Sequence, residues 1–169
     1  FLAAKKYKAK NIIRITGDCP LIEGRLIDEM INKFKKGKYD YVNNAKPPHF
    51  SDGFDIEVFN FKSLKDAFKN ASTTIEKEHV TPYIKKNIKL NIGRLNQVES
   101  FDTKLSIDKP KDLKNVKKIF EFFSPNIYFS VRSIFKNNLH KKLIKMKSTK
   151  AQKLKVKTQQ GQILWRKAK

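Results

Sequence analysis

The chain has 169 residues, enough for one ordinary domain with a hydrophobic core, and 39% of them are hydrophobic. Its opening does not read as a secretory signal peptide, no apolar run approaches the ~20 residues of a membrane span, and a single cysteine excludes an internal disulfide, so we expect a cytoplasmic protein. The net charge of +22 is uneven, because residues 1–125 hold 25 basic and 16 acidic residues while 126–169 hold 13 basic residues and no acid.

Apolar periodicity and turn residues predict alternating strands and helices. In the first half of the chain we expect the end of a helix at 1–10, a strand at 11–16, a helix at 24–36, a strand at 39–43, a loop at 45–53 and a strand at 54–61. A helix at 63–70 capped by Ser63, a helical stretch at 74–87 interrupted by Pro82, and strands at 88–95 and 105–108 should follow. The last part should contain helices at 111–123 and 128–138, a Lys-rich linker at 141–158 and some helical character at 161–169. This alternation predicts an α/β fold of three layers with a mostly parallel sheet.

Two predicted strands end in the same pattern, Asp-x-Pro. Asp18 and Pro20 follow the first strand, and Asp108 and Pro110 follow a later one. Ligands of open α/β sheets bind outside the carboxyl ends of the strands, and paired carboxylates suit Mg²⁺. Either aspartate alone is more often a turn-forming or helix-capping residue, but together they predict a site.

Other acidic residues and one histidine are weaker candidates. Asp55 and Glu57 share one face of a predicted strand, where they would either hydrogen-bond sugar hydroxyls or form a solvated face. Glu78 and His79 lie side by side on a predicted helix, and most such histidines are structural or surface groups. Cys19 suits a packed thiol, because no histidine is near it in the sequence to activate it.

Four motifs in order resemble one family: Arg-Ile-Thr-Gly-Asp-Cys-Pro-Leu-Ile at 14–22, Asp-Gly-Phe-Asp-Ile-Glu-Val-Phe at 52–59, Glu-His-Val-Thr-Pro-Tyr-Ile at 78–84, and Ser-Ile-Asp-Lys-Pro-Lys-Asp-Leu at 106–113. They are similar to the spore-coat polysaccharide cytidylyltransferases, relatives of the CMP-Kdo and acylneuraminate (CMP-sialate) synthetases. The resemblance covers about residues 1–123. It implies a Rossmann-like nucleotide-diphospho-sugar transferase fold, and transfer of CMP from CTP to a sugar acid or related sugar for cell-surface polysaccharide.

The resemblance also implies roles for single residues. Asp18 and Asp108 match the family's metal-ligating aspartates and would hold Mg²⁺, while Asp55, Glu57, Glu78 and His79 become candidates for the sugar pocket. The expected partners are CTP and a sugar, with a homodimer left open. The family's first strand and its Gly-rich loop bearing Arg and Lys are not in this sequence, so we expect an N-terminally truncated chain that is inactive alone.

The end of the chain offers two alternatives. Residues 158–169 resemble the opening of a glutamate-1-semialdehyde-type aminotransferase, so the chain would divide into a cytidylyltransferase part at 1–125, a basic helix and linker at 126–160, and the first helix of a truncated aminotransferase at 161–169. That domain would use PLP, although no PLP-binding lysine can be assigned here. A basic nucleic-acid-binding module at 126–169 is the lesser alternative, because no recognition motif is present.

Overall fold

A mixed four-stranded sheet organises the chain. The computed structural model describes residues 1–45, 52–87, 89–95, 104–139, 154–157 and 163–166. The strands β1 (Asn11–Arg14), β2 (Tyr41–Asn43), β3 (Glu57–Asn60) and β4 (Ile92–Arg94) lie in the order β1-β3-β2-β4. β3 pairs antiparallel with β1 and β2, and β2 pairs parallel with β4. Three of these strands therefore run in one direction, as expected, and β3 is the reversed strand.

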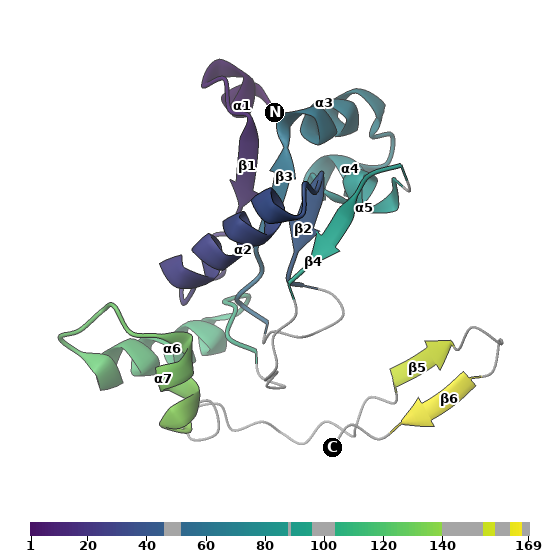
Figure 1. The fold of residues 1–169 in the computed structure, drawn as a ribbon. Helices are drawn as coiled ribbons and strands as arrows, with labels where there is room; N and C mark the ends of the chain where they lie inside the picture. Colours follow the sequence, from purple (N-terminus) through teal and green to yellow (C-terminus); the bar gives the residue numbers. More distant parts are fainter. Residues whose placement is uncertain (46–51, 88, 96–103, 140–153, 158–162, 167–169) are drawn as a thin grey trace.

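Helices cover both faces of this sheet (Figure 1). On one face, Met30 and Phe34 of α2 (Gly24–Lys36) pack in one cluster with Val42 and Val58. On the other face, Tyr41 and Phe59 pack with α3 (Phe61–Asn70) and α5 (Pro82–Lys86). Because successive residues of a strand point to opposite faces, β2 and β3 supply both clusters, and the expected three layers are confirmed.

The helices α6 (Pro110–Phe123) and α7 (Val131–Lys136) extend the first cluster. Ile119 and Ile134 are fully buried in it, and Glu23 at the start of α2 accepts a hydrogen bond from the backbone N–H of Val131 at 2.8 Å. The helix predicted at 128–138 is confirmed in part, and it belongs to the core rather than to the basic tail.

Local signals predicted most helices but misplaced one cap. Pro82 does divide the stretch 74–87 into α4 (Thr74–His79) and α5, since proline lacks the N–H that a continuous helix needs. The N-cap of α3, however, is Asn60, whose side chain accepts from the N–H of Ser63. Ser63 is buried in the first turn, so its prediction as the cap is wrong.

The strand predicted at 105–108 does not join the sheet. Lys104 forms an isolated parallel bridge with Asp52, and Leu105 and Ser106 are buried without forming a strand. The sequence pattern correctly predicted that the apolar residues of this segment are buried in the core. Their backbone, however, pairs with a turn instead of a strand. The end of the predicted loop at 45–53 provides that turn, while residues 46–51 lie outside the described part.

The end of the chain forms strands where a helix was expected. β5 (Leu154–Lys157) and β6 (Ile163–Arg166) pair antiparallel as a separate two-stranded sheet. The helix predicted at 161–169 is therefore wrong over Ile163–Arg166, and the predicted linker contains β5. Branched and aromatic residues favour strands once a partner strand is available, and helical periodicity over so short a segment is weak evidence.

Within the described residues, no helix combines the length and the apolar character that crossing a bilayer demands.

We expect Ile134→Ala to lower the free energy of unfolding by about 2–5 kcal/mol, because it leaves a cavity in the shared core of α2, α6 and α7. Urea denaturation followed by circular dichroism measures this. The matched control is Phe122→Ala on α6, whose side chain is 54% exposed and whose removal should cost far less. Equal small effects for the two variants would mean that α7 does not pack on the core.

Candidate functional site

Three segments distant in sequence meet just beyond the carboxyl end of β1. The N–H of Ile107 donates to the carbonyl of Asp18 at 2.8 Å, and the N–H of Leu105 donates to the carbonyl of Asp52 at 2.7 Å. Gly53 makes the second contact possible, because it adopts a φ of +110° and a Cβ there would lie 2.6 Å from the carbonyl carbon of Leu105. The Asp18 and Asp108 segments are thus side by side through their backbones.

Asp18 lies in a tight turn that follows β1. The N–H of Cys19 donates to the carbonyl of Thr16 at 3.2 Å, and the Cys19 Sγ lies 3.7 Å from Oδ1 of Asp18. A hydrogen bond from the Thr16 side chain holds the pKa of Asp18 below its ordinary value, with smaller help from the charge of Arg14. Asp18 is therefore a half-exposed carboxylate that stays ionised.

Asp108 is not the cap of α6. The N-cap is Lys109, and the carboxylate of Asp112 at the third helical position completes a capping box by accepting from the N–H groups of Asp108 and Lys109 at 3.1 and 3.0 Å. The Asp108 carboxylate is 57% exposed and its described partner is the ammonium group of Lys104, which also contacts Asp112. Asp108 thus has an accessible carboxylate that already attracts a cation.

Asp55 lies two residues before Glu57 and within electrostatic reach of Asp52 and Asp18. Burial raises its pKa, and the charges of Asp52 and Glu57 raise it further. Ser106 donates to the Asp52 carboxylate at 2.9 Å, which holds Asp52 in place beside this group. Burial likewise raises the pKa of the Cys19 thiol, so Cys19 is a packed thiol as expected, 5% exposed.

Glu57 is the most tightly held of the predicted site residues. Its carboxylate pairs with Arg14 of β1 at 2.8 Å and with Lys85 of α5 at 2.6 Å. Tyr41 of β2 and Thr81 donate to it as well, at 2.6 and 2.9 Å. Burial alone would raise the pKa of Glu57, but the bonds from Lys85, Tyr41 and Thr81 outweigh burial and lower it.

The remaining predicted residues lie apart from these acids. Glu78 and His79 are exposed at the end of α4, which is a different element from the turn that carries Asp18. Val80 follows them with φ +66° and ψ −51°, and the N–H of Thr81 donates to the carbonyl of His79 at 2.7 Å. This is a γ-turn of the rare positive-φ kind, strained for a β-branched residue. Strain of this kind is often kept at functional sites.

The donor chemistry at Asp18 and Asp108 fits Mg²⁺. Both are hard oxygen ligands on adjoining segments, and Mg²⁺ commonly takes one or two carboxylates and leaves its other positions to water and phosphate. Among the described residues, no three His, Cys, Asp or Glu side chains gather closely enough to hold a metal ion by themselves. A site that is completed by substrate oxygens is consistent with both observations.

Sequence reasoning missed the cations of this region, Arg14, Lys85 and Lys104. Arg14 interrupts the apolar run Ile12–Ile15, which was a signal that its charge needed a partner. Lys85 and Lys104 gave none, because they stand among many lysines. It also missed Asn44, a buried side chain that donates to the carbonyl of Phe54 at 2.7 Å and accepts from the N–H of Ile56 at 2.8 Å.

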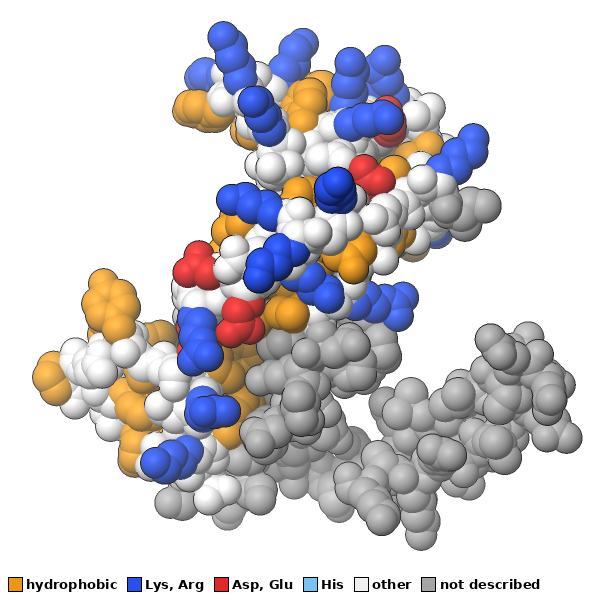
Figure 2. All heavy atoms as spheres, in the orientation of Figure 1, with side chains coloured by type: hydrophobic (Ala, Val, Ile, Leu, Met, Phe, Trp, Pro, Cys, Tyr) orange, Lys and Arg blue, Asp and Glu red, His pale blue; other side chains and the backbone are white. Residues whose placement is uncertain are grey.

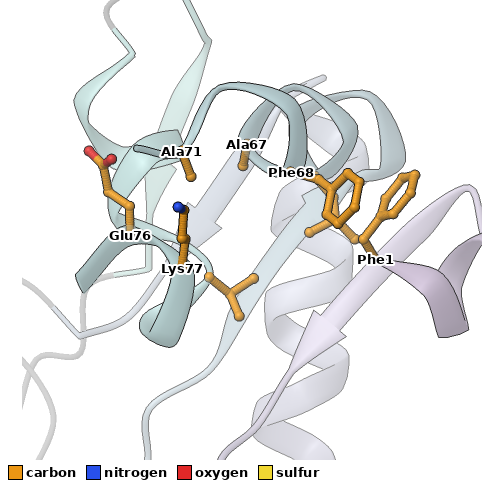
Figure 3. A pocket seen from close by; sticks show the side chains of 8 residues that line it. Phe1, Ala67, Phe68, Ala71, Glu76 and Lys77 are labelled. Atoms are coloured by element: carbon orange, nitrogen blue, oxygen red, sulfur yellow. The ribbon is translucent and has the colours of Figure 1, made fainter. Parts of the chain in front are cut away.

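A cavity of about 300 Å³ lies elsewhere, between α3, α4 and the first residue (Figure 3). The rings of Phe1 and Phe68 stack at 4.2 Å on one side of it, and Glu76 and Lys77 stand on the other. Its walls share no residue with the segments around Asp18. The Glu76 carboxylate is occupied in capping α4, so the cavity is largely apolar and offers little for phosphate or sugar chemistry.

Comparisons with known proteins agree with the motif order. A family model described as Cytidylyltransferase matches residues 1–142. An uncharacterised protein of Methanocaldococcus jannaschii is 35% identical over 142 residues, covering 80% of this chain and 57% of that protein. The spore coat polysaccharide biosynthesis protein SpsF of Bacillus subtilis is 33% identical over 121 residues, covering 68% of this chain and 48% of that protein.

The fold is similar to a solved structure, a cytidylyltransferase from Leptospira borgpetersenii, with a TM-score of 0.73 and 30% identity. That match covers 82% of this chain and 61% of the solved one. The chain spans about half the length of the curated relatives it matches, 57% and 48%.

We expect Glu57→Gln to lower the free energy of unfolding at pH 7 by about 3 kcal/mol. This is the low end for breaking a buried ion pair, because Arg14 and Lys85 keep 29% and 43% of their side chains exposed. The native pKa of Glu57 is below its ordinary 4.5, so its contribution is full above about pH 4.5 and is lost as the pH falls through the native value. The difference in free energy of unfolding between wild type and Glu57→Gln should therefore become smaller as the pH falls from 7 to 3. Urea denaturation at each pH measures this difference.

The control is Glu29→Gln, which removes an exposed pair with Arg25 on α2 and should change stability by less than about 0.5 kcal/mol. A gap for Glu57→Gln that does not depend on pH would contradict the ionised state assigned to Glu57.

Proposed function

This chain belongs to the cytidylyltransferase family, and we propose that the full-length protein transfers CMP from CTP to a sugar, releasing pyrophosphate. The observation that carries the proposal is the backbone bond between Asp18 and Ile107, which brings the two carboxylate-bearing segments together. In this reaction a sugar hydroxyl attacks the α-phosphate of CTP, and negative charge grows on that phosphate and on the leaving pyrophosphate. A protein that promotes it needs fixed positive charge where these oxygens lie.

Asp18 and Asp108 are the residues that would hold Mg²⁺ in this reaction. A bound Mg²⁺ supplies Lewis-acid neutralisation of the phosphate oxygens. Asp18 contributes a carboxylate that stays ionised, and the turn from Thr16 to Cys19 fixes its position. Lys104 balances the charge of Asp108 in the absence of a metal ion, so its ammonium group would have to leave Asp108 when the ion binds.

We propose a sugar acid or a related sugar of cell-surface polysaccharide as the acceptor. The name of the Bacillus subtilis relative, a spore coat polysaccharide biosynthesis protein, supports this class. Asp55 is our first candidate for a contact to sugar hydroxyls, because it lies beside the Asp18 segment and is partly exposed. Glu78 and His79 remain candidates from the motif alone, and Glu57 would have to give up one of its present partners.

Neither alternative gains support from the structure. The tail segment that resembles an aminotransferase helix is the strand β6 over Ile163–Arg166. The basic module at 126–169 lies largely outside the described residues, and over the described part Figure 2 shows Lys and Arg side chains on the visible face together with acidic and apolar ones.

We expect Asp18→Asn to reduce CTP-dependent pyrophosphate release by the full-length protein at least 100-fold, while the protein stays folded, because the half-exposed side chain is not part of the core. Release is measured with CTP, MgCl₂ and a panel of sugar acids. Asp28→Asn, an exposed aspartate of α2, is the control and should retain activity. Retained activity in Asp18→Asn would remove this residue from the site.

Variants of Asp108 and Asp112 distinguish a role in metal binding from a role in capping α6. We expect Asp108→Asn to weaken Mn²⁺ binding, measured by electron paramagnetic resonance, at least tenfold, with little change in stability. Asp112→Ala should do the reverse, because it removes the oxygen that accepts from the N–H groups at the start of α6, worth about 1 kcal/mol, and keeps the metal affinity. Unchanged Mn²⁺ affinity in Asp108→Asn would contradict its assignment as a ligand.

A further inference from the structure

Arg14 and Lys85 form a pair of cations around one buried carboxylate. Glu57 is 4% exposed, and one cation of the pair would be enough to neutralise it. Arg14 bonds Oε2 and Lys85 bonds Oε1, so the two cations stand on different oxygens of the same group. The three side chains together carry a net charge of +1.

Both cations can still donate to a ligand. Arg14 uses a single terminal nitrogen for Glu57, out of the five N–H donors of a guanidinium group, and Lys85 has three donors on its ammonium nitrogen. Their side chains are 29% and 43% exposed, so neither is sealed in the core. Because Glu57 already fixes their positions, a ligand that binds them need not supply the side-chain ordering itself.

The pair lies next to the proposed reaction site. Arg14 is the last residue of β1, four positions before Asp18, and its charge lowers the pKa of Asp18. The charge of Lys85 acts on Asp55 in the same way. The two cations that contact Glu57 are therefore close enough to influence the charges of Asp18 and Asp55.

The strained turn at Val80 contributes to this arrangement. It directs Thr81, which is 1% exposed, so that its hydroxyl bonds both oxygens of Glu57 at 2.9 and 3.1 Å. Helix α5, which carries Lys85, begins directly after it at Pro82. The unfavourable backbone conformation of Val80 thus lies directly before α5, where it affects the position of Lys85.

We propose that Arg14 and Lys85 bind an anionic group of a substrate, a carboxylate or a phosphate, and that Glu57 is the positioning residue that holds them for it. The inference rests on the proposed function for the identity of the substrate, while the anion site itself does not depend on turnover. A carboxylate would come from a sugar acid, and a phosphate would come from CTP.

The test is calorimetric titration of the full-length protein with two sugar acids, Kdo and N-acetylneuraminate, and separately with CTP, all with MgCl₂. We expect Lys85→Gln and Arg14→Gln to weaken binding of one probe class at least tenfold, and Lys85→Arg to restore most of it. Lys86→Gln is the matched control, because Lys86 is the next residue of α5, is 71% exposed and pairs with Glu76 instead.

Glu57→Gln should weaken binding of the same probe class at pH 7 and leave binding of the other class unchanged. Where this variant is poorly folded, Tyr41→Phe replaces it, since it removes one hydrogen bond to Glu57 and keeps both ion pairs. A purely structural Glu57 would lower stability without a selective loss of one probe class.

The outcomes separate the two claims. Loss of sugar-acid affinity alone assigns the pair to a sugar carboxylate, and loss of CTP affinity alone assigns it to nucleotide phosphates. Unchanged affinity for both, or a wild type that binds neither probe, overturns the anion site. Lys85-dependent binding without pyrophosphate release would overturn the proposed function and leave the anion site standing.

Discussion

The buried charge of Glu57 is the constraint around which the sheet and its helices are arranged. A carboxylate that is removed from water is costly unless ion pairs and hydrogen bonds replace the water. Here the partners come from β1, β2, the turn before α5 and α5 itself, so neutralising one side chain fixes four elements relative to β3. Their register matters, because Arg14 stands directly opposite Glu57 across the β1–β3 pair. A shift by one residue would leave the charge without its partner.

Contacts between distant segments also form the candidate site beside Glu57. Asp18, Asp52 and Asp108 are far apart in the chain, and irregular backbone rather than a strand joins them, through bonds to Leu105 and Ile107. Irregular segments can place carboxylates close together because their backbone groups are satisfied by one another. The cost is visible in the raised pKa of Asp55, where burial and like charges act together. The proposed use of these acids is to hold a cation that neutralises phosphate oxygens.

Local patterns predicted what depends on local physics. The helix at 24–36 was predicted with the bounds of α2, because its apolar stripe recurs with the helical period and Gly37 ends it. Asp18 was located correctly in a turn after β1 for a similar reason, since glycine and proline fix that turn. Patterns failed where pairing with another segment decides the structure. The segment at 105–108 looks like a strand yet pairs with Asp52, and the helix at 161–169 gave way to β6 because β5 offers it a partner strand.

The sequence by itself determined the family and the order of the helices and strands over most of the chain, and it supplied the two aspartates that we propose as metal ligands. These follow from short-range spacing and motif order, which survive without knowledge of contacts. Only the tertiary structure decided what Glu57 does. Its neighbours in sequence are apolar and its partners lie 16 to 43 positions away, so the pattern could not show that this residue is the centre of an ion-pair network. Charge neutralisation acts across space, and a one-dimensional pattern does not contain those distances.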